Sequence, residues 1–264
     1  MLFRSGAFWC GGDPRAPRSL PGRQIWLDAF IIKRYPVTCQ EYCDFLNDLV
    51  RSGRAQQAER AWTGDQLLPR AAGADGTYQV GPDPEKHPVD PSQPVSLVNY
   101  FGAAMYACWL AHQTGLRWTI PGELALEKAA RGVDGRAFPW GDAFDPTWCN
   151  MSESSPMPGP IPVREVRSDT SPWGVCGMAG NVAWWSADVY RALGPPVPLA
   201  LPREGAEGVD EDIRMVVKGG AYTSVEHLCR GATRLTYMSQ HASPALGFGI
   251  ARLPPEPVRP VMVR

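Results

Sequence analysis

The chain has 264 residues, a formal net charge of −1 and 20% charged residues, so it is long enough to bury a full hydrophobic core. The near-neutral charge argues against a protein that binds nucleic acid or a membrane surface, because both usually carry an excess of basic residues. No apolar run is long enough to cross a membrane. The first residues, 1–6, are too polar for a signal peptide, and we expect a cytoplasmic protein.

The composition indicates irregular backbone held by aromatic packing. Twenty-seven glycines and twenty-seven prolines are spread along the chain, which also has ten tryptophans. Seven cysteines are scattered and include no CxxC pair, so the spacing typical of a zinc site is absent. Most of the cysteines are interpreted as small buried apolar residues.

Residues 1–92 predict one strand and two helices. Aromatic and β-branched residues over 24–32 indicate a strand. Thr38 followed by Glu41 forms a capping box, and the apolar spacing after it predicts a helix over 38–50. Residues 51–92 are polar and lack periodicity, so they are interpreted as an insertion or long loop with a short helix near 54–62.

The rest of the chain predicts two further helices, over 101–113 and 123–130, and strands over 215–222 and 247–252. Glu123 and Glu127 lie one helical turn apart and could form a carboxylate pair, although solvation of the helix face and capping of loops explain them better. The proline-rich tail, 253–264, is expected on the surface. In the glycine–asparagine stretch 177–185, Trp184 and Trp185 are neighbours, so on a strand one should face a core and the other outward.

The motifs then occur in a recognisable order. They are Pro36-Val37-Thr38, Pro121-Gly122-Glu123, Phe138-Pro139-Trp140-Gly141-Asp142, Met178-Ala179-Gly180-Asn181-Val182, Lys218-Gly219-Gly220 and Gly247-Phe248. This collinear series resembles the formylglycine-generating enzyme (sulfatase-modifying factor) family. The resemblance implies a single C-type-lectin-like α+β domain, rich in loops, over residues 1–264.

The resemblance also implies a Cu(I) site made by two cysteines five residues apart near the C-terminus, which oxidises a substrate cysteine. Here the first position is Ser224 and only Cys229 remains. A neutral hydroxyl is a poor ligand for Cu(I), so we expect neither copper nor another cofactor and interpret Cys229 as structural. The alternative is a divergent oxidoreductase acting on a thiol through Cys229, with Ser224 and His227 beside it.

Metal sites of other relatives are altered as well. Gly177 and Trp184 stand where many relatives have calcium ligands, and calcium needs about six to eight oxygens. Asn150 matches a ligand of a second calcium site in the family, so calcium at Asn150 remains an expectation beside the alternative of a loop asparagine. The four histidines are well separated, which excludes the branch that binds non-haem iron through a histidine-rich bundle.

We therefore expect a non-catalytic recognition module of a bacterial signalling system. Relatives occur fused to bacterial kinases, or as variable proteins diversified over the segment that matches 222–246. A separately encoded kinase, protease or other signalling protein is the expected partner. The alternative is a solvated loop, with Arg230 and Arg234 as braces. The expected binding residues are Trp184, Tyr222, Glu226, His227, Arg230, Arg234 and Tyr237.

Overall fold

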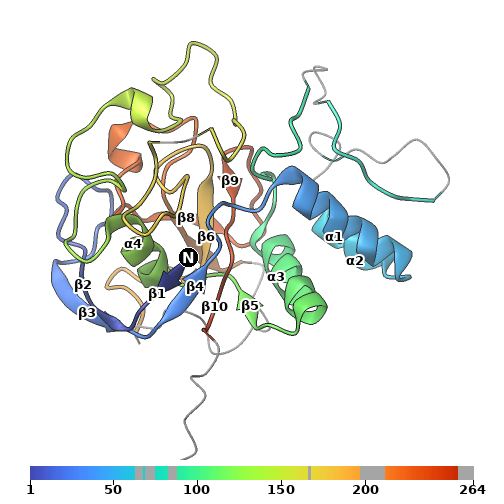
Figure 1. Ribbon diagram of the computed structural model, residues 1–264, viewed down its shortest axis with the longest axis horizontal. Helices are drawn as coiled ribbons and strands as arrows, with labels where there is room; N and C mark the ends of the chain where they lie inside the picture. Colours follow the sequence, from blue (N-terminus) through green and yellow to red (C-terminus); the bar gives the residue numbers. More distant parts are fainter. Residues whose placement is uncertain (63–67, 69–74, 83–87, 166–167, 197–211, 255–264) are drawn as a thin grey trace, which may run out of the picture.

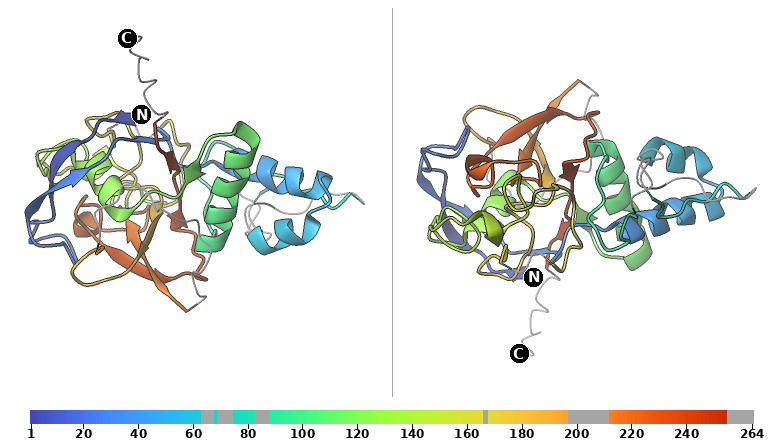
Figure 2. Two further views of the ribbon diagram at one scale, coloured as in Figure 1. Left: turned by 90° about the horizontal axis from the view of Figure 1, so that it is seen from below. Right: turned by 90° about the horizontal axis from the view of Figure 1, so that it is seen from above.

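The computed structural model describes residues 1–62, 68, 75–82, 88–165, 168–196 and 212–254. These residues form an α+β domain of helices, small sheets and long loops, which confirms the predicted fold class. Helices α1, α2 and α3 lie together at one end of the molecule, while α4 and most of the strands occupy the other (Figures 1 and 2). Within the described residues, no helix combines the length and apolar composition needed to cross a membrane.

The four helices occur where the sequence predicts them. Their bounds are Cys39–Arg51 (α1), Ala55–Ala61 (α2), Tyr100–Thr114 (α3) and Glu123–Arg131 (α4). Thr38 and Glu41 form both hydrogen bonds of the capping box at the start of α1. At α3, the Asn99 side chain accepts from the Gly102 amide, and Gly115 ends the helix with a φ of 67°. Glycine tolerates that left-handed conformation without strain.

The strands form two four-stranded sheets and one two-stranded sheet, with orders β1-β4-β10-β5, β8-β7-β6-β9 and β2-β3. Their bounds are Leu2–Phe3 (β1), Gly6–Cys10 (β2), Arg23–Leu27 (β3), Phe30–Ile32 (β4), Trp118–Thr119 (β5), Ala183–Val189 (β6), Arg214–Lys218 (β7), Leu235–Met238 (β8), Leu246–Gly247 (β9) and Ala251–Arg252 (β10). Two short 3₁₀ helices cover Pro146–Trp148 (η1) and Glu226–Leu228 (η2).

Two of the predicted strands are each divided between two sheets. The run 24–32 becomes β3, which pairs with β2, and β4, which pairs with β1 and β10. The run 247–252 contributes to β9 beside β6 and to β10 beside β4 and β5. The prediction of single strands is wrong because each half finds a different partner strand, which local propensity does not encode.

The two adjacent tryptophans of β6 lie in separate hydrophobic cores. Trp185 is fully buried among residues of α1, α3 and β9, and Trp184 is 1% exposed among residues of α4 and β2 to β4. They face opposite sides of the strand, as predicted, but the expected outward orientation of one ring is wrong. β6 lies between β7 and β9, and the two cores cover both faces of the strand at Trp184 and Trp185, so neither ring reaches solvent.

Part of the polar segment 51–92 contributes to the core. Ala58 and Ala61 of α2, together with Leu68 and Tyr78, are buried against α1 and α3. Residues 63–67, 69–74 and 83–87 of this segment lie outside the described residues, as do 255–264 of the predicted proline-rich tail.

Candidate functional site

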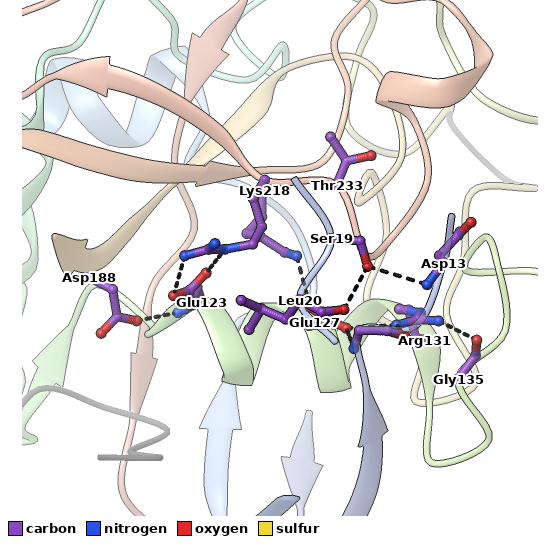
Figure 3. A network of polar contacts seen from close by, with 12 residues as sticks. Asp13, Ser19, Leu20, Glu123, Glu127, Arg131, Gly135, Asp188, Lys218 and Thr233 are labelled. Atoms are coloured by element: carbon purple, nitrogen blue, oxygen red, sulfur yellow. Dashed lines mark hydrogen bonds and ion pairs between the residues drawn. The ribbon is translucent and has the colours of Figure 1, made fainter. Parts of the chain in front are cut away.

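A buried ion-pair network joins α4 to the sheet and to the N-terminal loop (Figure 3). Glu127 accepts from Lys218 Nζ at 3.0 Å, from Arg131 Nη1 at 2.7 Å and from the Gly11 amide at 2.7 Å. Burial alone would raise the pKa of Glu127, but Lys218 and Arg131 outweigh burial and lower it. Glu127 is 1% exposed, so the expected solvated helix face is wrong for this residue, whereas its bond from the Gly11 amide is the expected capping of a loop.

A second ion pair in the network holds the start of β8 against α4. Arg234 donates to Glu123 through Nε at 2.6 Å and Nη2 at 3.0 Å, and both side chains are buried. Arg234 also donates to the carbonyl of Arg191. These contacts satisfy the buried charges of Glu123 and Arg234. The solvated-face interpretation is therefore wrong for Glu123 too, and Arg234 braces the fold rather than facing a partner.

The loop after β7 is fixed to the N-terminal segment by a chain of charges. Arg230, which is 8% exposed, donates to Asp13 at 2.7 Å and to Glu226 at 3.3 Å. The exposed Arg15 binds Glu226 at 2.7 Å. The Arg230 guanidinium also lies 4.9 Å from the centre of the Phe138 ring, a cation–π contact. Glu226 remains partly exposed, whereas Arg230 is committed to intramolecular contacts.

The residues at the family's two copper positions do not provide two thiolates. The Ser224 hydroxyl accepts the Ala221 amide at 2.9 Å, and Ser224 is 5% exposed. Cys229 is fully buried in a small apolar cluster with Ala137, Phe138, Cys149, Met151 and Ala179. Hydrogen bonding to the Cys229 thiol and burial raise the pKa of Cys149. His227 is exposed on η2 and is brought into no group of metal-binding side chains in the described part of the chain.

Asn150 has hydrogen-bond partners that explain its burial without a cation. Its side-chain amide donates to the carbonyl of Gly159 at 2.9 Å and to Asn181 Oδ1 at 3.1 Å. Asn181 has a φ of 71° and binds both backbone groups of Ile161 through its side chain. No carboxylate occurs among these contacts in the described residues. The oxygen-rich, acidic donor set that calcium prefers is therefore not formed by these partners.

The segment 222–246 forms two separate exposed regions rather than one face. The first follows the end of β7 and contains the half-buried Tyr222 and the exposed Thr223, Val225 and His227. The second contains Tyr237, whose ring stacks on His241 at 4.8 Å between centroids. β7 and β8 are antiparallel, and Met215 pairs with Tyr237 at the start of β7. The two regions therefore lie at opposite ends of the β7–β8 pair.

Trp184 does not line either exposed region. Its ring packs against Gly249, where an added Cβ would lie 2.0 Å from Cζ3. A cavity of about 10 Å³ beside the ring is lined by Lys218 and Met178 among others, which is too small for anything larger than a water molecule. Burial excludes Trp184 from the expected floor of a binding face.

The sequence did not indicate three of the features that shape this region. Asp169, which is fully buried, accepts from the amides of Met178, Ala179 and Gly180 and so orders the glycine–asparagine loop. Lys218 and Asp13 complete the ion pairs described above. Their charges alone do not indicate burial, because a buried charged residue looks identical to an exposed one in the sequence.

Comparisons with known proteins agree with the motif order. The family model described as a sulfatase-modifying factor enzyme 1-like domain matches residues 1–253. The formylglycine-generating enzyme of Thermomonospora curvata is 29% identical over 301 residues, covering 96% of this chain and 93% of that protein. The hercynine oxygenase of Mycobacterium tuberculosis is 30% identical over 225 residues, covering 81% of this chain and 50% of that protein.

A third relative is a larger protein. The serine/threonine-protein kinase Pkn1 of Chlamydia trachomatis serovar L2 is 28% identical over 243 residues, which is 89% of this chain but 35% of the kinase. Among solved structures, PvdO from Pseudomonas aeruginosa has a TM-score of 0.70 at 22% identity, covering 96% of this chain and 93% of PvdO. The variable protein 1 of Treponema denticola has a TM-score of 0.67 at 15% identity, covering 96% and 94%. At these identities the structures show the fold alone.

Proposed function

The chain belongs to the family of the sulfatase-modifying factor enzyme 1-like domain, and from this premise we propose that it is a non-catalytic recognition domain that binds a protein partner. Relatives in the family are named as oxidative enzymes and as kinases. The choice between catalysis and recognition therefore depends on this chain's own residues.

One observation carries the proposal: the two positions of the copper cysteines are occupied by groups already committed to the fold. The Ser224 hydroxyl caps the turn at Ala221, and the Cys229 thiol is buried with no exposed surface. A reactive thiol needs access and thiolate character. Neither a surface thiol nor a pair of thiolates is therefore presented at the family's catalytic position.

The binding surface is assigned to the loop after β7, which we call the 222–228 surface. It consists of Tyr222, Thr223, Val225, Glu226 and His227. The 152–158 loop borders it, because Ser152 binds the Ser224 carbonyl through its amide at 3.0 Å and its hydroxyl at 2.8 Å. Met157 in that loop is 85% exposed and Val225 is 39% exposed. The surface therefore combines apolar, aromatic and charged groups, as protein-binding patches do.

The ion pairs beneath the 222–228 surface favour binding by a preformed loop. Glu226 is held by Arg15 and Arg230, and Arg230 by Asp13. A loop already held in one conformation loses little entropy when it binds. The chain is similar in sequence to part of a serine/threonine-protein kinase, and this similarity supports a signalling protein as the partner.

Photo-crosslinking tests the surface directly. A photo-reactive amino acid at position 225 in the native host should capture one protein that the same residue at position 241 does not capture. With that protein in hand, Tyr222→Ala and His227→Ala should each weaken binding by about tenfold or more, with an unchanged melting temperature. Tyr237→Ala, in the exposed region at the opposite end of the β7–β8 pair, is the matched control. Equal binding by all three variants would contradict the assignment.

A peptide assay separates recognition from the alternative of thiol chemistry at Cys229. The protein is incubated with Cu(I), oxygen and a cysteine peptide, and the peptide mass is followed. We expect no conversion of the cysteine. Copper-dependent turnover that disappears in Cys229→Ala would establish the divergent oxidoreductase instead.

A further inference from the structure

Two arginines that are distant in the sequence, Arg34 and Arg164, contact the same aromatic ring. The guanidinium carbon of Arg34 lies 5.3 Å from the centre of the Tyr35 ring, and that of Arg164 lies 5.6 Å from it. Both arginines are exposed and Tyr35 is half-buried. A directly stacked guanidinium would lie about 4 Å above the ring centre, so each group is displaced toward the ring edge. We call these three residues the Tyr35 cluster.

The backbone that carries the two arginines is fixed by hydrogen bonds from other segments. The Arg34 carbonyl accepts from the Cys176 amide at 2.9 Å. The Val163 amide, one residue before Arg164, donates to the Ser92 carbonyl at 3.0 Å. With the backbone held and both guanidinium groups resting on one ring, the cluster loses little conformational entropy when it binds a ligand.

The other arginines that contact an aromatic ring have an internal hydrogen-bond acceptor. These acceptors are the Asp13 carboxylate for Arg230, the Glu123 carboxylate for Arg234 and the Leu253 carbonyl for Arg252. Within the described residues, neither guanidinium of the Tyr35 cluster has such an acceptor. The N–H donors of Arg34 and Arg164 are therefore available to a ligand.

The charges next to the Tyr35 cluster do not neutralise it. Lys33, which precedes Arg34, is paired with Glu41. Glu165, which follows Arg164, is exposed and forms no ion pair in the part of the chain that the structure describes. The two guanidinium groups repel each other across the ring. An anion that contacts both groups would replace this repulsion with attraction.

We propose that the Tyr35 cluster is a binding site for a phosphate group. A phosphate monoester carries a charge of about −1.5 to −2 at pH 7 and three acceptor oxygens, which match two guanidinium groups in charge and in number of acceptors. A carboxylate has one charge and two oxygens, which a single arginine satisfies through a bidentate contact. The Tyr35 ring holds both guanidinium groups through cation–π contacts. This inference is independent of the proposed partner binding at the 222–228 surface.

Titration with inorganic phosphate at constant ionic strength tests the site without any partner protein. The NMR signals of the arginine Nε–H groups are followed in the folded protein. We expect saturable shifts of two signals, which disappear in Arg34→Ala and Arg164→Ala. Each of these variants should bind phosphate about tenfold more weakly or worse. Sulfate, which is also a tetrahedral dianion, should compete with phosphate, whereas acetate at the same ionic strength should not.

Three control variants separate the cluster from general electrostatic attraction. Arg23→Ala removes the same charge from an exposed arginine that has no ion pair or ring contact within the described residues, and it should bind phosphate like the wild type. Tyr35→Phe keeps the ring and should also bind like the wild type. Tyr35→Leu removes the ring that positions both arginines and should weaken binding. Melting temperatures confirm that each variant is folded.

A capped Gly–phosphoserine–Gly peptide distinguishes a phosphorylated chain from the free ion as the source of the phosphate group. Binding of this peptide at least as tightly as inorganic phosphate, with no binding of the unphosphorylated peptide, would identify a phosphorylated side chain as the ligand. Binding of inorganic phosphate alone would identify the free ion. The proposal is wrong if the wild-type protein shows no saturable phosphate binding, or if Arg23→Ala weakens binding as much as Arg34→Ala and Arg164→Ala do.

Discussion

Glu123 and Arg234 form a two-pronged ion pair, with donor–acceptor distances of 2.6 and 3.0 Å, in which both residues are at most 1% exposed. The pair joins the first residue of α4 to the residue before β8. The Glu123 amide in turn donates to Asp188 at 2.6 Å. A helix, a strand end and β6 are thus held together by one buried carboxylate and its neighbours.

Arg234→Ala should destabilise the protein strongly, because it leaves the Glu123 carboxylate buried without its partner. Removing one member of a buried ion pair lowers the free energy of unfolding by about 3–5 kcal/mol. Urea denaturation of the variant and the wild type measures this loss. Arg15→Ala is the matched control, because Arg15 is exposed and its ion pair with Glu226 should contribute no more than about 1 kcal/mol. Equal stability of the two variants would contradict a bracing role for Arg234.

Asp169 should make the protein less stable as the pH rises from about 4 to about 6. Burial raises its pKa from 3.8 to about 6, although three backbone amides partly offset this effect. The folded state therefore binds the proton more tightly than the unfolded chain. The stabilisation that comes from this tighter proton binding is fully present below the unfolded pKa and is lost as the pH rises through the folded pKa. It amounts to about 3 kcal/mol at most.

The measurement for Asp169 is the pH slope of the unfolding free energy rather than its absolute value. Asp169→Asn cannot ionise, so its profile should lack this decline even if the variant is less stable at every pH. Asp145 is the control: it is partly exposed, and hydrogen bonds from Thr147 lower its pKa, so its contribution to the unfolding free energy rises with pH instead of falling. A wild-type profile parallel to that of Asp169→Asn would exclude the raised pKa.

The helices and the fold class could be predicted from the sequence because their signals are local or collinear. The capping box at Thr38 and the glycine at position 115 specify helix ends within a few residues. The order of motifs from Pro36 to Phe248 identifies the fold without any knowledge of contacts. Strand partners are different, because the division of 24–32 between two sheets is decided by residues far away in the chain.

The candidate site could be predicted only in part, since exposure depends on tertiary packing. The substitution at Ser224 is visible in the sequence, and it remains the basis of the proposed function. The burial of Trp184 and Arg234 is not visible, because an aromatic or an arginine suits a binding surface as well as a core. The partner of each charged residue, such as Asp13 for Arg230, lies too far away in sequence to be inferred from spacing.

Gly249→Ala should destabilise the protein through a clash with the buried Trp184 ring. An added Cβ would lie 2.0 Å from Cζ3 and 2.4 Å from Cε3 of the indole, and a rigid, fully packed ring cannot move aside without disturbing its core. We expect a loss of about 1–3 kcal/mol in the free energy of unfolding. Gly159→Ala is the matched control, because an added Cβ there meets no atom within 4 Å. Similar stabilities of the two variants would show that the Trp184 core is loosely packed.

Ser224→Ala separates a structural serine from a remnant of a catalytic position. The Ser224 hydroxyl accepts the buried Ala221 amide at 2.9 Å, so its removal should cost about 1–3 kcal/mol of unfolding free energy by leaving that N–H without a partner. Thr223→Ala, at the exposed neighbouring position, should stay within about 0.5 kcal/mol of wild type.

Both variants should leave the cysteine peptide unconverted in the presence of Cu(I) and oxygen, as we expect for the wild type. A Ser224→Ala protein that is as stable as Thr223→Ala would contradict the turn-capping role. The turn from Ala221 to Ser224 lies within the loop that forms the 222–228 surface. Ser224→Ala should therefore also weaken binding of the partner. Ser224→Thr keeps the hydroxyl and should bind the partner with an affinity near the wild-type value.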